Sequence, residues 1–420
     1  MKKLLTLITL GLTCFGVTAC KKKDKGFKPK YDKNTSCKIN ITGHYDNFEA
    51  LEDEFIRFNK YYPNVQLTYT KMDNYKKMIG TSLKSDDAPD IFFSFPYMIG
   101  DSAYDDVFNA CEDFSSTNLG FDLSNIRDGL LFKDNEKHTY MVPIYTNTYG
   151  MLINENLFKE KNINIPTTYN EFLDACRKFK EAGISNPTMA YSSDKDLALY
   201  AMFYPYFCAQ IKDNADAIKK VNDLSAEGGE YLRSSLTLIK DFMDKGYMNL
   251  DECKALKNDY EAVILRFYEG DIPMMLTTAN TVSGTEKREA KSENFKAHPF
   301  KYSFHPVPTT ETGGFYLTTV SLAFSVNKNS KNLKMVNEFM RFILQTEELG
   351  NMGKIKRLIT PTVDMSLDDI YSSFGTVTPI YTSEIGLTTE ADQRVRTAGL
   401  KVCNGILSID EAIEGFYKKE

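Results

Sequence analysis

Residues 88–93 read APDIFF, and this short run decides the fold class that we expect for the 420-residue chain. Its apolar end shows no polar alternation, which is typical of a strand that is covered on both faces. Upstream, strand-like stretches at 38–42 and 65–69 alternate with helical apolar spacing at 48–58 and 75–83. This repeated order of strand and helix predicts an α/β fold with parallel strands.

The middle of the chain contains two extended stretches, at 141–144 and 148–154, which flank the polar segment 145–147. We interpret this segment as the first crossing of the chain between two domains. The spacing of a capping box, in which a Ser or Thr precedes a Glu by three positions, occurs at 168–171 and at 408–411. Each box predicts the start of a helix.

Length, charge and cysteine spacing limit the class of protein. A chain of 420 residues exceeds what one compact core usually holds, so we expect two domains. The net charge of −6 gives no indication of nucleic-acid binding. No CxxC pair occurs and the four histidines are scattered, so neither a metal site nor a cofactor is predicted. A disulfide is left open, but we expect mostly buried free thiols among Cys37, Cys111, Cys176, Cys208, Cys253 and Cys403.

The first twenty residues have the pattern of a lipoprotein export signal. Two lysines precede an apolar stretch, residues 4–19, that is shorter than the roughly 20 residues of a membrane-spanning helix, and Cys20 follows it. By resemblance to bacterial lipoproteins, residues 1–19 would be removed as a signal peptide and Cys20 would be acylated, which anchors the chain at the outer face of a membrane. An ordinary cleaved signal is the alternative. Residues 20–36 are charged and lack apolar periodicity, so we expect a flexible tether.

Short motifs of one protein family occur in order from residue 40 to about residue 415. They are the helix and turn at 55–65, APDI at 88–91, MLINENLF at 151–158 with PTTY at 166–169, FYEG at 267–270, HPVP at 305–308 and LITPT at 358–362. The ordered set resembles the extracellular solute-binding proteins, family 1, of sugar-type ABC importers, which include maltose-binding protein. The chain departs from the family pattern at Asn64, Ile153 and Tyr169, where Gly, Tyr and Trp are usual.

This resemblance implies a two-lobed, periplasmic-binding-protein-like fold of type II, with a ligand cleft between lobes that are joined by hinge crossings. Lobe 1 would contain residues 37–144 and 316–358, and lobe 2 would contain residues 148–310 and 361–420. Closure about the hinge would bury a sugar or oligosaccharide, and an ABC permease would recognise the closed form. The resemblance thus implies a monomeric, extracytoplasmic binding protein without enzymatic activity.

Sugars bind proteins through two kinds of contact, because their hydroxyl groups pair with amides and carboxylates while their C–H faces stack on aromatic rings. We therefore expect contacts at the carboxyl ends of the lobe 1 strands, in the first crossing and on lobe 2. The candidate residues are His44, Tyr45, Asp46, Ser94, Tyr97, Tyr145, Asn147, Tyr204, Tyr206, Asn280 and the backbone of Gly313 and Gly314.

The ligand class and a rival function stay open at this level. The chain has no tryptophan, and Asn280 stands near the position where relatives place a stacking Trp, so a small saccharide, a polyol, a glycerophosphodiester or an unrelated solute would also fit. The rival is a surface glycoside hydrolase that uses two carboxylates. The sequence contains no G-x-S-x-G, HExxH, P-loop or strand-following GxGxxG motif that would favour an enzyme.

Overall fold

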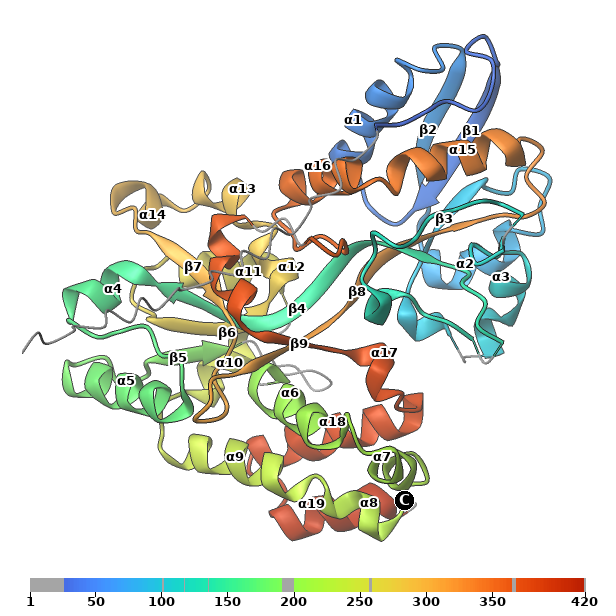
Figure 1. Ribbon diagram of the computed structural model, residues 1–420. Helices are drawn as coiled ribbons and strands as arrows, with labels where there is room; N and C mark the ends of the chain where they lie inside the picture. The colour runs from blue at the N-terminus through green and yellow to red at the C-terminus, as the bar shows by residue number, and fades with distance from the viewer. Residues whose placement is uncertain are drawn as a thin grey trace, which may run out of the picture.

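The computed structural model describes residues 26–99, 102–116, 118–134, 136–190, 200–256, 259–364 and 368–418. Its helices and strands form two lobes that long strands connect (Figure 1). The predicted two-lobed α/β fold is confirmed. None of the helices in the described ranges is both long enough and apolar enough to cross a bilayer.

Lobe 1 is built on three parallel strands that follow the alternating pattern of the sequence. They are β1 (Cys37–Gly43), β2 (Val65–Lys71) and β3 (Ile91–Ser94), and β1 lies between the other two. All four residues of β3 are buried, as expected for a strand that is covered on both faces. The helices around this sheet are α1 (Glu49–Phe58), α2 (Tyr75–Ser82), α3 (Asp105–Asn109), α15 (Leu333–Ile343) and α16 (Thr346–Lys356) (Figure 1). The 3-10 turns η1 (Pro96–Met98) and η2 (Ser102–Tyr104) follow β3, whereas η3 (Asp128–Leu130) lies at the junction of the lobes, where the hydroxyl of Ser383 donates to the carbonyl of Gly129.

Lobe 2 contains the second half of β4 (Val142–Asn154) together with β5 (Thr188–Ala190), β6 (Met274–Thr278) and β7 (Tyr302–His305). Both predicted capping boxes are present, at the starts of α5 (Tyr169–Glu181) and α19 (Ile409–Tyr417). The remaining elements are α4 (Glu155–Glu160), α6 (Tyr200–Ile211), α7 (Ala215–Asn222), α8 (Ala226–Glu230), α9 (Arg233–Asp244), α10 (Leu250–Leu256), α11 (Tyr260–Phe267), α12 (Ala279–Val282), α13 (Thr285–Glu289), α14 (Glu293–Ala297), η4 (Asp369–Thr376) and α18 (Thr389–Cys403).

Strands β4 and β8 (Phe315–Val326) connect the two lobes. β4 pairs with β8 over Val142–Thr148 and with β6 over Tyr149–Ile153, antiparallel in both cases. β8 pairs with β3 near its carboxyl end and with β9 (Thr378–Tyr381), which continues into α17 (Thr382–Ile385), near its amino end. The strand order is β2-β1-β3-β8-β4-β6-β5. The sheet is therefore mixed rather than wholly parallel, because β8 runs antiparallel to β3 and β4, and β4 also runs antiparallel to β6 and β7.

One strand replaces the two extended stretches that the sequence pattern predicts around 145–147. The pairing of β4 with β8 shifts register between Pro143 and Tyr145 and again between Tyr145 and Thr146. A bulge of this kind lets a strand continue through residues that do not alternate. The polar Thr146 stays inside the strand because its hydroxyl donates a hydrogen bond of 2.6 Å to the carbonyl of Ile359.

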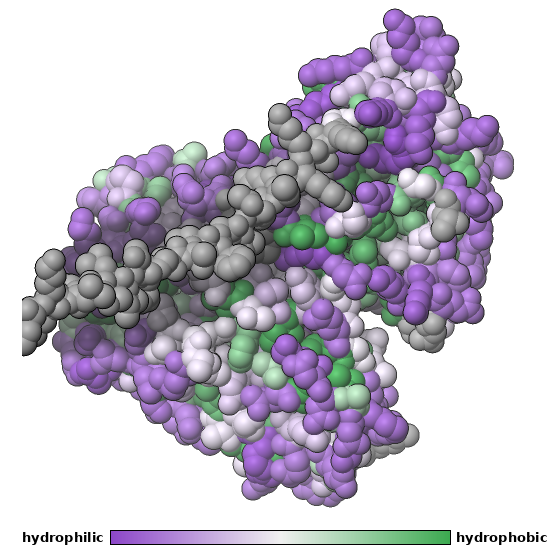
Figure 2. Space-filling view, viewed as in Figure 1, coloured by the Kyte–Doolittle hydropathy of each residue, from purple (hydrophilic) through white to green (hydrophobic). Residues whose placement is uncertain are grey.

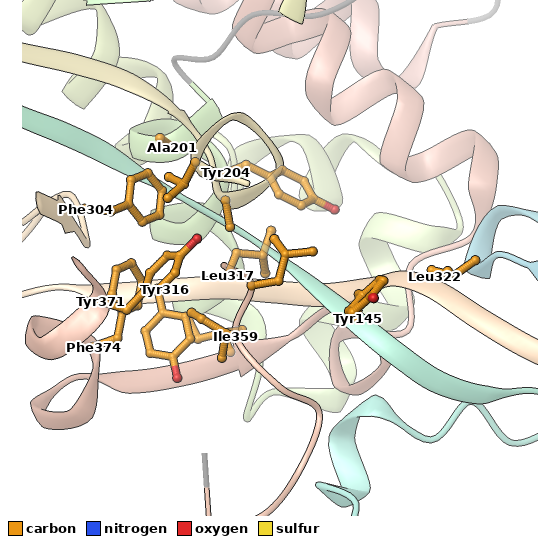
Figure 3. Close-up of a cluster of buried hydrophobic side chains, with 14 of the residues drawn as sticks. Tyr145, Ala201, Tyr204, Phe304, Tyr316, Leu317, Leu322, Ile359, Tyr371 and Phe374 are labelled. Carbon is orange, nitrogen blue, oxygen red and sulfur yellow. The ribbon is translucent and has the colours of Figure 1, made fainter. Parts of the chain in front are cut away.

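A third segment of chain runs beside these strands after α16. Arg127 holds it in place, since Nη2 donates to the carbonyl of Thr360 at 2.6 Å and the backbone N–H donates to that of Pro361 at 3.0 Å. Figure 3 shows Ile359 of this segment among buried side chains that include Leu317 of β8. The lobe limits given above remain a proposal, because β4 and β8 pass through the junction without a break.

The first described residues are packed against lobe 1. Phe27 is buried, with its ring centroid 6.3 Å from that of Phe58 and 5.3 Å from that of Phe342. The guanidinium of Arg341 lies 5.3 Å from the centre of the Phe27 ring. The expectation of a flexible tether over residues 20–36 is therefore corrected from Phe27 onward, because an aromatic pocket between α1 and α15 binds this segment.

We predict that Phe27→Ala destabilises lobe 1 by about 2 kcal/mol, which is the usual contribution of one buried phenylalanine ring. Urea denaturation followed by circular dichroism would measure the loss. The matched control is Lys33→Ala, which removes an exposed side chain from the same segment. Equal midpoints for the two variants would contradict the packing described here.

Candidate functional site

Four aromatic side chains line the sheet edge where β1 and β3 end. The ring centroid of His44 lies 4.7 Å from that of Tyr45 and 5.5 Å from that of Phe95, and Phe95 stacks on Tyr97 at 5.4 Å with an interplanar angle of 8°. We call these four residues the aromatic arc. Tyr97 is 42% exposed and His44 is exposed, while Tyr45 and Phe95 are half-buried. The arc therefore presents ring surface on which a sugar could stack.

Phe95 is absent from the residues predicted from the sequence, although it lies between Ser94 and Tyr97, two of those predicted. Ser94 is fully buried, and its hydroxyl lies 2.6 Å from that of Ser325 on β8. The side chain of Ser94 therefore faces strand β8, whereas that of Phe95, the first residue after β3, packs against His44 in the arc. The run FPY at residues 95–97 could have indicated Phe95, because aromatic residues continue there past the end of the strand.

Charged groups surround the aromatic arc. Asp46 is a surface group whose Oδ1 lies 2.7 Å from Nζ of Lys71, and this hydrogen bond and charge lower the pKa of Asp46. Although the His44 residue is exposed overall, the neighbouring rings partly desolvate its imidazole; this desolvation, and to a smaller extent the charge of Lys76, lowers the pKa of His44 and favours the neutral ring. The arc thus combines a neutral imidazole with tyrosine rings.

Two asparagines meet at the junction of the lobes. Oδ1 of Asn147, on β4, accepts a hydrogen bond of 3.3 Å from the backbone N–H of Asn280, at the start of α12. Oδ1 of Asn280 accepts one of 3.1 Å from the hydroxyl of Ser321 on β8. Both asparagines are half-buried, and neither side-chain NH₂ group donates to another described residue. The two amides can therefore donate to ligand oxygen atoms.

Two of the predicted tyrosines lie in the protein interior. Tyr145 is 1% exposed, and its hydroxyl donates a long hydrogen bond of 3.5 Å to the carbonyl of Met352. Tyr204 is 3% exposed, donates to Asp392 and has the guanidinium of Arg396 3.9 Å from its ring centre. Figure 3 shows both tyrosines among the buried side chains. Tyr145 therefore packs in the junction and Tyr204 in lobe 2, and neither ring is exposed enough in this structure to contact a ligand.

Tyr206, Gly313 and Gly314 have no contact with the aromatic arc in the part of the chain that the structure describes. Tyr206 is half-buried on α6. Gly313 has φ of 100° and its carbonyl accepts from Thr310, which makes a tight turn before β8. A Cβ at Gly314 would lie 2.9 Å from the carbonyl oxygen of Val307, so a glycine is needed there for close packing.

The two lobes touch on one side of the arc. Nζ of Lys287, on α13, lies 3.1 Å from Oε1 of Glu49, on α1. Nη1 of Arg357, after α16, donates to the hydroxyl of Thr285 at 3.2 Å. Elsewhere the surface is hollowed between the lobes, as Figure 2 shows on the face that it presents. The four side chains in these contacts are polar or charged, and they range from the exposed Lys287 and Glu49 to the fully buried Thr285.

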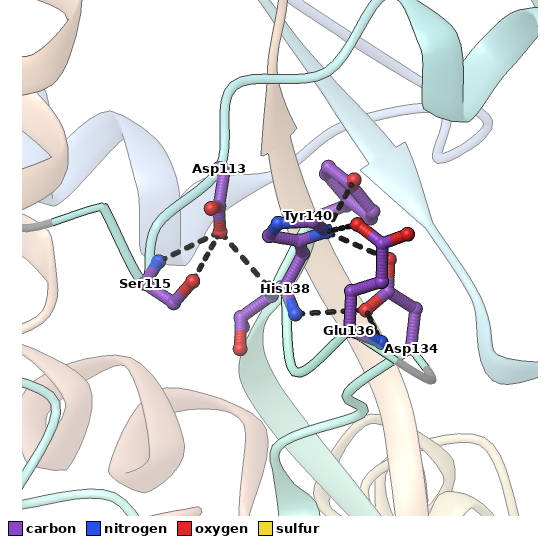
Figure 4. Close-up of polar contacts among 7 residues, drawn as sticks. Asp113, Ser115, Asp134, Glu136, His138 and Tyr140 are labelled. Atoms are coloured by element: carbon purple, nitrogen blue, oxygen red, sulfur yellow. Dashed lines mark hydrogen bonds and ion pairs between the residues drawn. The ribbon is translucent and has the colours of Figure 1, made fainter.

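A separate polar network in lobe 1 contains a histidine beside a carboxylate (Figure 4). Nδ1 of His138 lies 3.0 Å from Oδ2 of Asp134 and 3.1 Å from the hydroxyl of Tyr140. The nearby hydroxyl of Ser115 donates to Asp113 at 2.6 Å rather than to the histidine. The network therefore ties loops together and does not form the serine–histidine–carboxylate chain of a hydrolase.

Metal and disulfide chemistry have no support in the described residues. Within these ranges, no group of three His, Cys, Asp or Glu side chains could hold a metal ion. The cysteines that the structure describes are all free thiols, and five of the six are buried.

Comparisons with known proteins agree with this architecture. The sequence profile of a family described as bacterial extracellular solute-binding protein matches residues 42–349. The multiple sugar-binding protein of Streptococcus mutans is 21% identical over 350 residues, which cover 81% of this chain and 78% of that protein. The apo form of RafE from Streptococcus pneumoniae has a similar structure, with a TM-score of 0.69, 17% identity and coverage of 93% and 98%. A sugar transporter of Bacillus licheniformis in complex with stachyose gives a TM-score of 0.61, 18% identity and coverage of 91% and 98%.

We predict that His138 and His44 titrate on opposite sides of the ordinary histidine pKa of about 6.5. The hydrogen bond to Asp134 raises the pKa of His138, whereas burial lowers that of His44. The His138–Asp134 pair therefore stabilises its loops below the unfolded pKa and loses this contribution as the pH rises through the folded pKa.

Proton NMR titration of the ring signals would test these two values. Asp134→Asn should lower the pKa of His138 and leave that of His44 unchanged. A His138 signal that titrates below the ordinary value would show that the pair does not form.

Proposed function

The chain belongs to the bacterial extracellular solute-binding proteins, and from this membership we propose that it captures a saccharide by closure of its two lobes and delivers it to an ABC permease. The observations that carry the proposal are the aromatic arc at the strand ends of lobe 1 and the Asn147–Asn280 pair at the junction of the lobes. Rings on one wall, and at the junction amide NH₂ groups that donate to no other described residue, offer the two contact types that sugars need.

Relatives of the same fold support a saccharide ligand. RafE has been solved in complex with raffinose, the Bacillus licheniformis protein with stachyose, and a binding protein of Bifidobacterium animalis with mannobiose. We extend this ligand class to the present chain. The binding site that we propose contains His44, Tyr45, Phe95, Tyr97, Asn147 and Asn280.

Closure requires that the ligand binds the closed state better than the open one. The exposed Lys287–Glu49 ion pair between the lobes is worth at most about 1 kcal/mol, so it does not lock the lobes by itself. Ligand bridging between the arc and the Asn147–Asn280 pair would supply the remaining free energy. The closed form would then differ in shape from the open one, and the permease would recognise that difference.

We further propose that the protein is a monomer anchored outside the cytoplasm through acylated Cys20. Residues 1–25, which include the predicted signal peptide and Cys20, lie outside the described residues. The docking of Phe27 on lobe 1 would leave only residues 21–26 between the lipid and the folded domain. The anchored protein would thus stay close to the membrane that holds its permease.

A glycoside hydrolase remains the rival function, and the geometry gives it little support. A general acid needs a carboxyl group whose pKa is raised by its surroundings. Asp46 carries the carboxyl group next to Tyr45 in the sequence, and its pKa is lowered because Lys71 pairs with it. The relatives named above are binding proteins of transporters.

We predict that raffinose or stachyose raises the melting temperature of the mature protein and is recovered unchanged. Tyr97→Ala should weaken the affinity by up to about tenfold, because aromatic stacking contributes about 0.5–1.5 kcal/mol. Asn280→Ala should weaken it by about fivefold, which corresponds to one neutral hydrogen bond of about 1 kcal/mol.

The matched control is Tyr31→Ala, since Tyr31 is 41% exposed, like Tyr97, but lies on the docked N-terminal segment. Isothermal titration calorimetry measures the affinities, and chromatography of the sugar detects any hydrolysis product. Product formation would favour the hydrolase, and equal affinities for all variants would contradict the proposed site.

A further inference from the structure

Two lysines flank the aromatic arc, one at each end. Nζ of Lys76, on α2, lies 4.4 Å from the ring centre of Tyr97. Nζ of Lys356, the last residue of α16, lies 5.8 Å from the ring centre of Tyr45. Each ammonium group thus approaches a tyrosine that we place in the ligand site, in the manner of a cation–π contact.

Neither lysine has a carboxylate partner. Within the described ranges, no carboxylate oxygen lies within the 4.0 Å ion-pair distance of either ammonium group. The nearby carboxylates are already paired, since Asp46 and Asp73 contact Lys71 and Glu49 contacts Lys287. Among the described residues, the arc therefore lies between two positive charges that have no ion-pair partner.

The stability of the two helices does not explain why lysines occupy these positions. Lys76 stands in the first turn of α2, where the helix dipole disfavours a cation, and that turn has no acidic residue. Lys356 lies at the favourable end of its helix, but it is half-buried beside Lys287, and both burial and that second charge lower its pKa. The charge of Glu49 offsets only part of this effect, because Glu49 pairs with Lys287, and a negatively charged ligand would recover the remaining free energy.

We infer that the solute captured at this site is an anionic saccharide, whose carboxylate or phosphate group pairs with Lys76 or Lys356 while its ring stacks on the arc. This inference rests on the proposed saccharide-binding function and narrows its ligand class. Uronic acids and sugar phosphates share the required chemistry, a sugar ring that carries a compact anion. The amides of Asn147 and Asn280 would bind the hydroxyl groups of the same molecule.

Isothermal titration calorimetry with matched pairs of sugars tests the inference. The carboxylate arm compares digalacturonate with neutral galactobiose, the phosphate arm compares glucose 6-phosphate with glucose, and raffinose serves as an additional neutral sugar. We expect one anionic probe to bind at least about tenfold tighter than its neutral partner at about 50 mM salt. This advantage should shrink at about 300 mM salt, because ions screen the pairing with exposed lysine. The pair of sugars in which the anionic member binds more tightly shows whether the preferred anion is a carboxylate or a phosphate.

Lysine variants locate the effect. Lys76→Met and Lys356→Met keep the apolar stem of the side chain, and at least one of them should reduce the ratio of the affinity for the anionic probe to that for its neutral partner by about fivefold or more. The matched control is Lys77→Met, because Lys77 is exposed on the same helix as Lys76 and contacts none of the arc rings among the described residues. Lys356→Arg should keep the preference. Melting curves of the unliganded variants confirm that each one is folded.

The possible outcomes separate the two proposals. If neutral sugars bind as tightly as their anionic partners and both methionine variants behave like Lys77→Met, the anionic ligand is refuted while the saccharide receptor stands. If no sugar of either kind binds, both proposals fail together.

Discussion

The antiparallel pairing of β4 with β8 is the constraint on which the rest of the molecule depends. Each strand belongs to both lobes, because β4 changes partner from β8 to β6 after Thr148 and β8 reaches from β9 to β3. Buried hydroxyls fix the pair in place, since Thr148 donates to Thr318 at 3.2 Å and Thr146 donates to the chain segment after α16 at 2.6 Å. Breaking these buried hydrogen bonds would leave polar groups unsatisfied, so rotation of the lobes must bend the strands and cannot separate them.

The position of Lys356 depends on a second set of buried contacts, between α1 and α16. Nε of Arg57 lies 3.0 Å from Oε2 of Glu348 on α16, and the same guanidinium pairs with the fully buried Glu54 on α1. Burial raises the pKa of Glu54 to about 8 in spite of this arginine. Removing Arg57 would leave both buried carboxyl groups without their shared hydrogen-bond donor, so the docking of α16 is specific in its geometry. The carboxyl end of α16, with Lys356, is thereby held over Tyr45.

Local sequence patterns were sufficient to predict most of the fold, because the signals involved are short in range. The parallel strands β1 to β3 and the capping boxes of α5 and α19 are defined by neighbouring residues, and the structure contains all of them. The site was harder to predict. Tyr97 and Tyr145 are the same residue type after or within a strand, yet one is 42% exposed and the other 1%, because only long-range packing by β8 and α16 decides the burial of Tyr145. Lys356 is more than three hundred positions from Tyr45 in the sequence, so no local pattern could predict that the two side chains meet.

The arrangement also suggests an order of events in ligand capture. The members of the aromatic arc contact one another within lobe 1 and need nothing from lobe 2 to hold their positions. Asn280 belongs to lobe 2 and is bonded to Asn147 on the strand that bends. At the proposed site, a ligand would therefore stack on the preformed arc while the lobes are open and would reach the amides of the junction only as they close. Because the second set of contacts strengthens with closure, it supplies the differential affinity that a hinge requires.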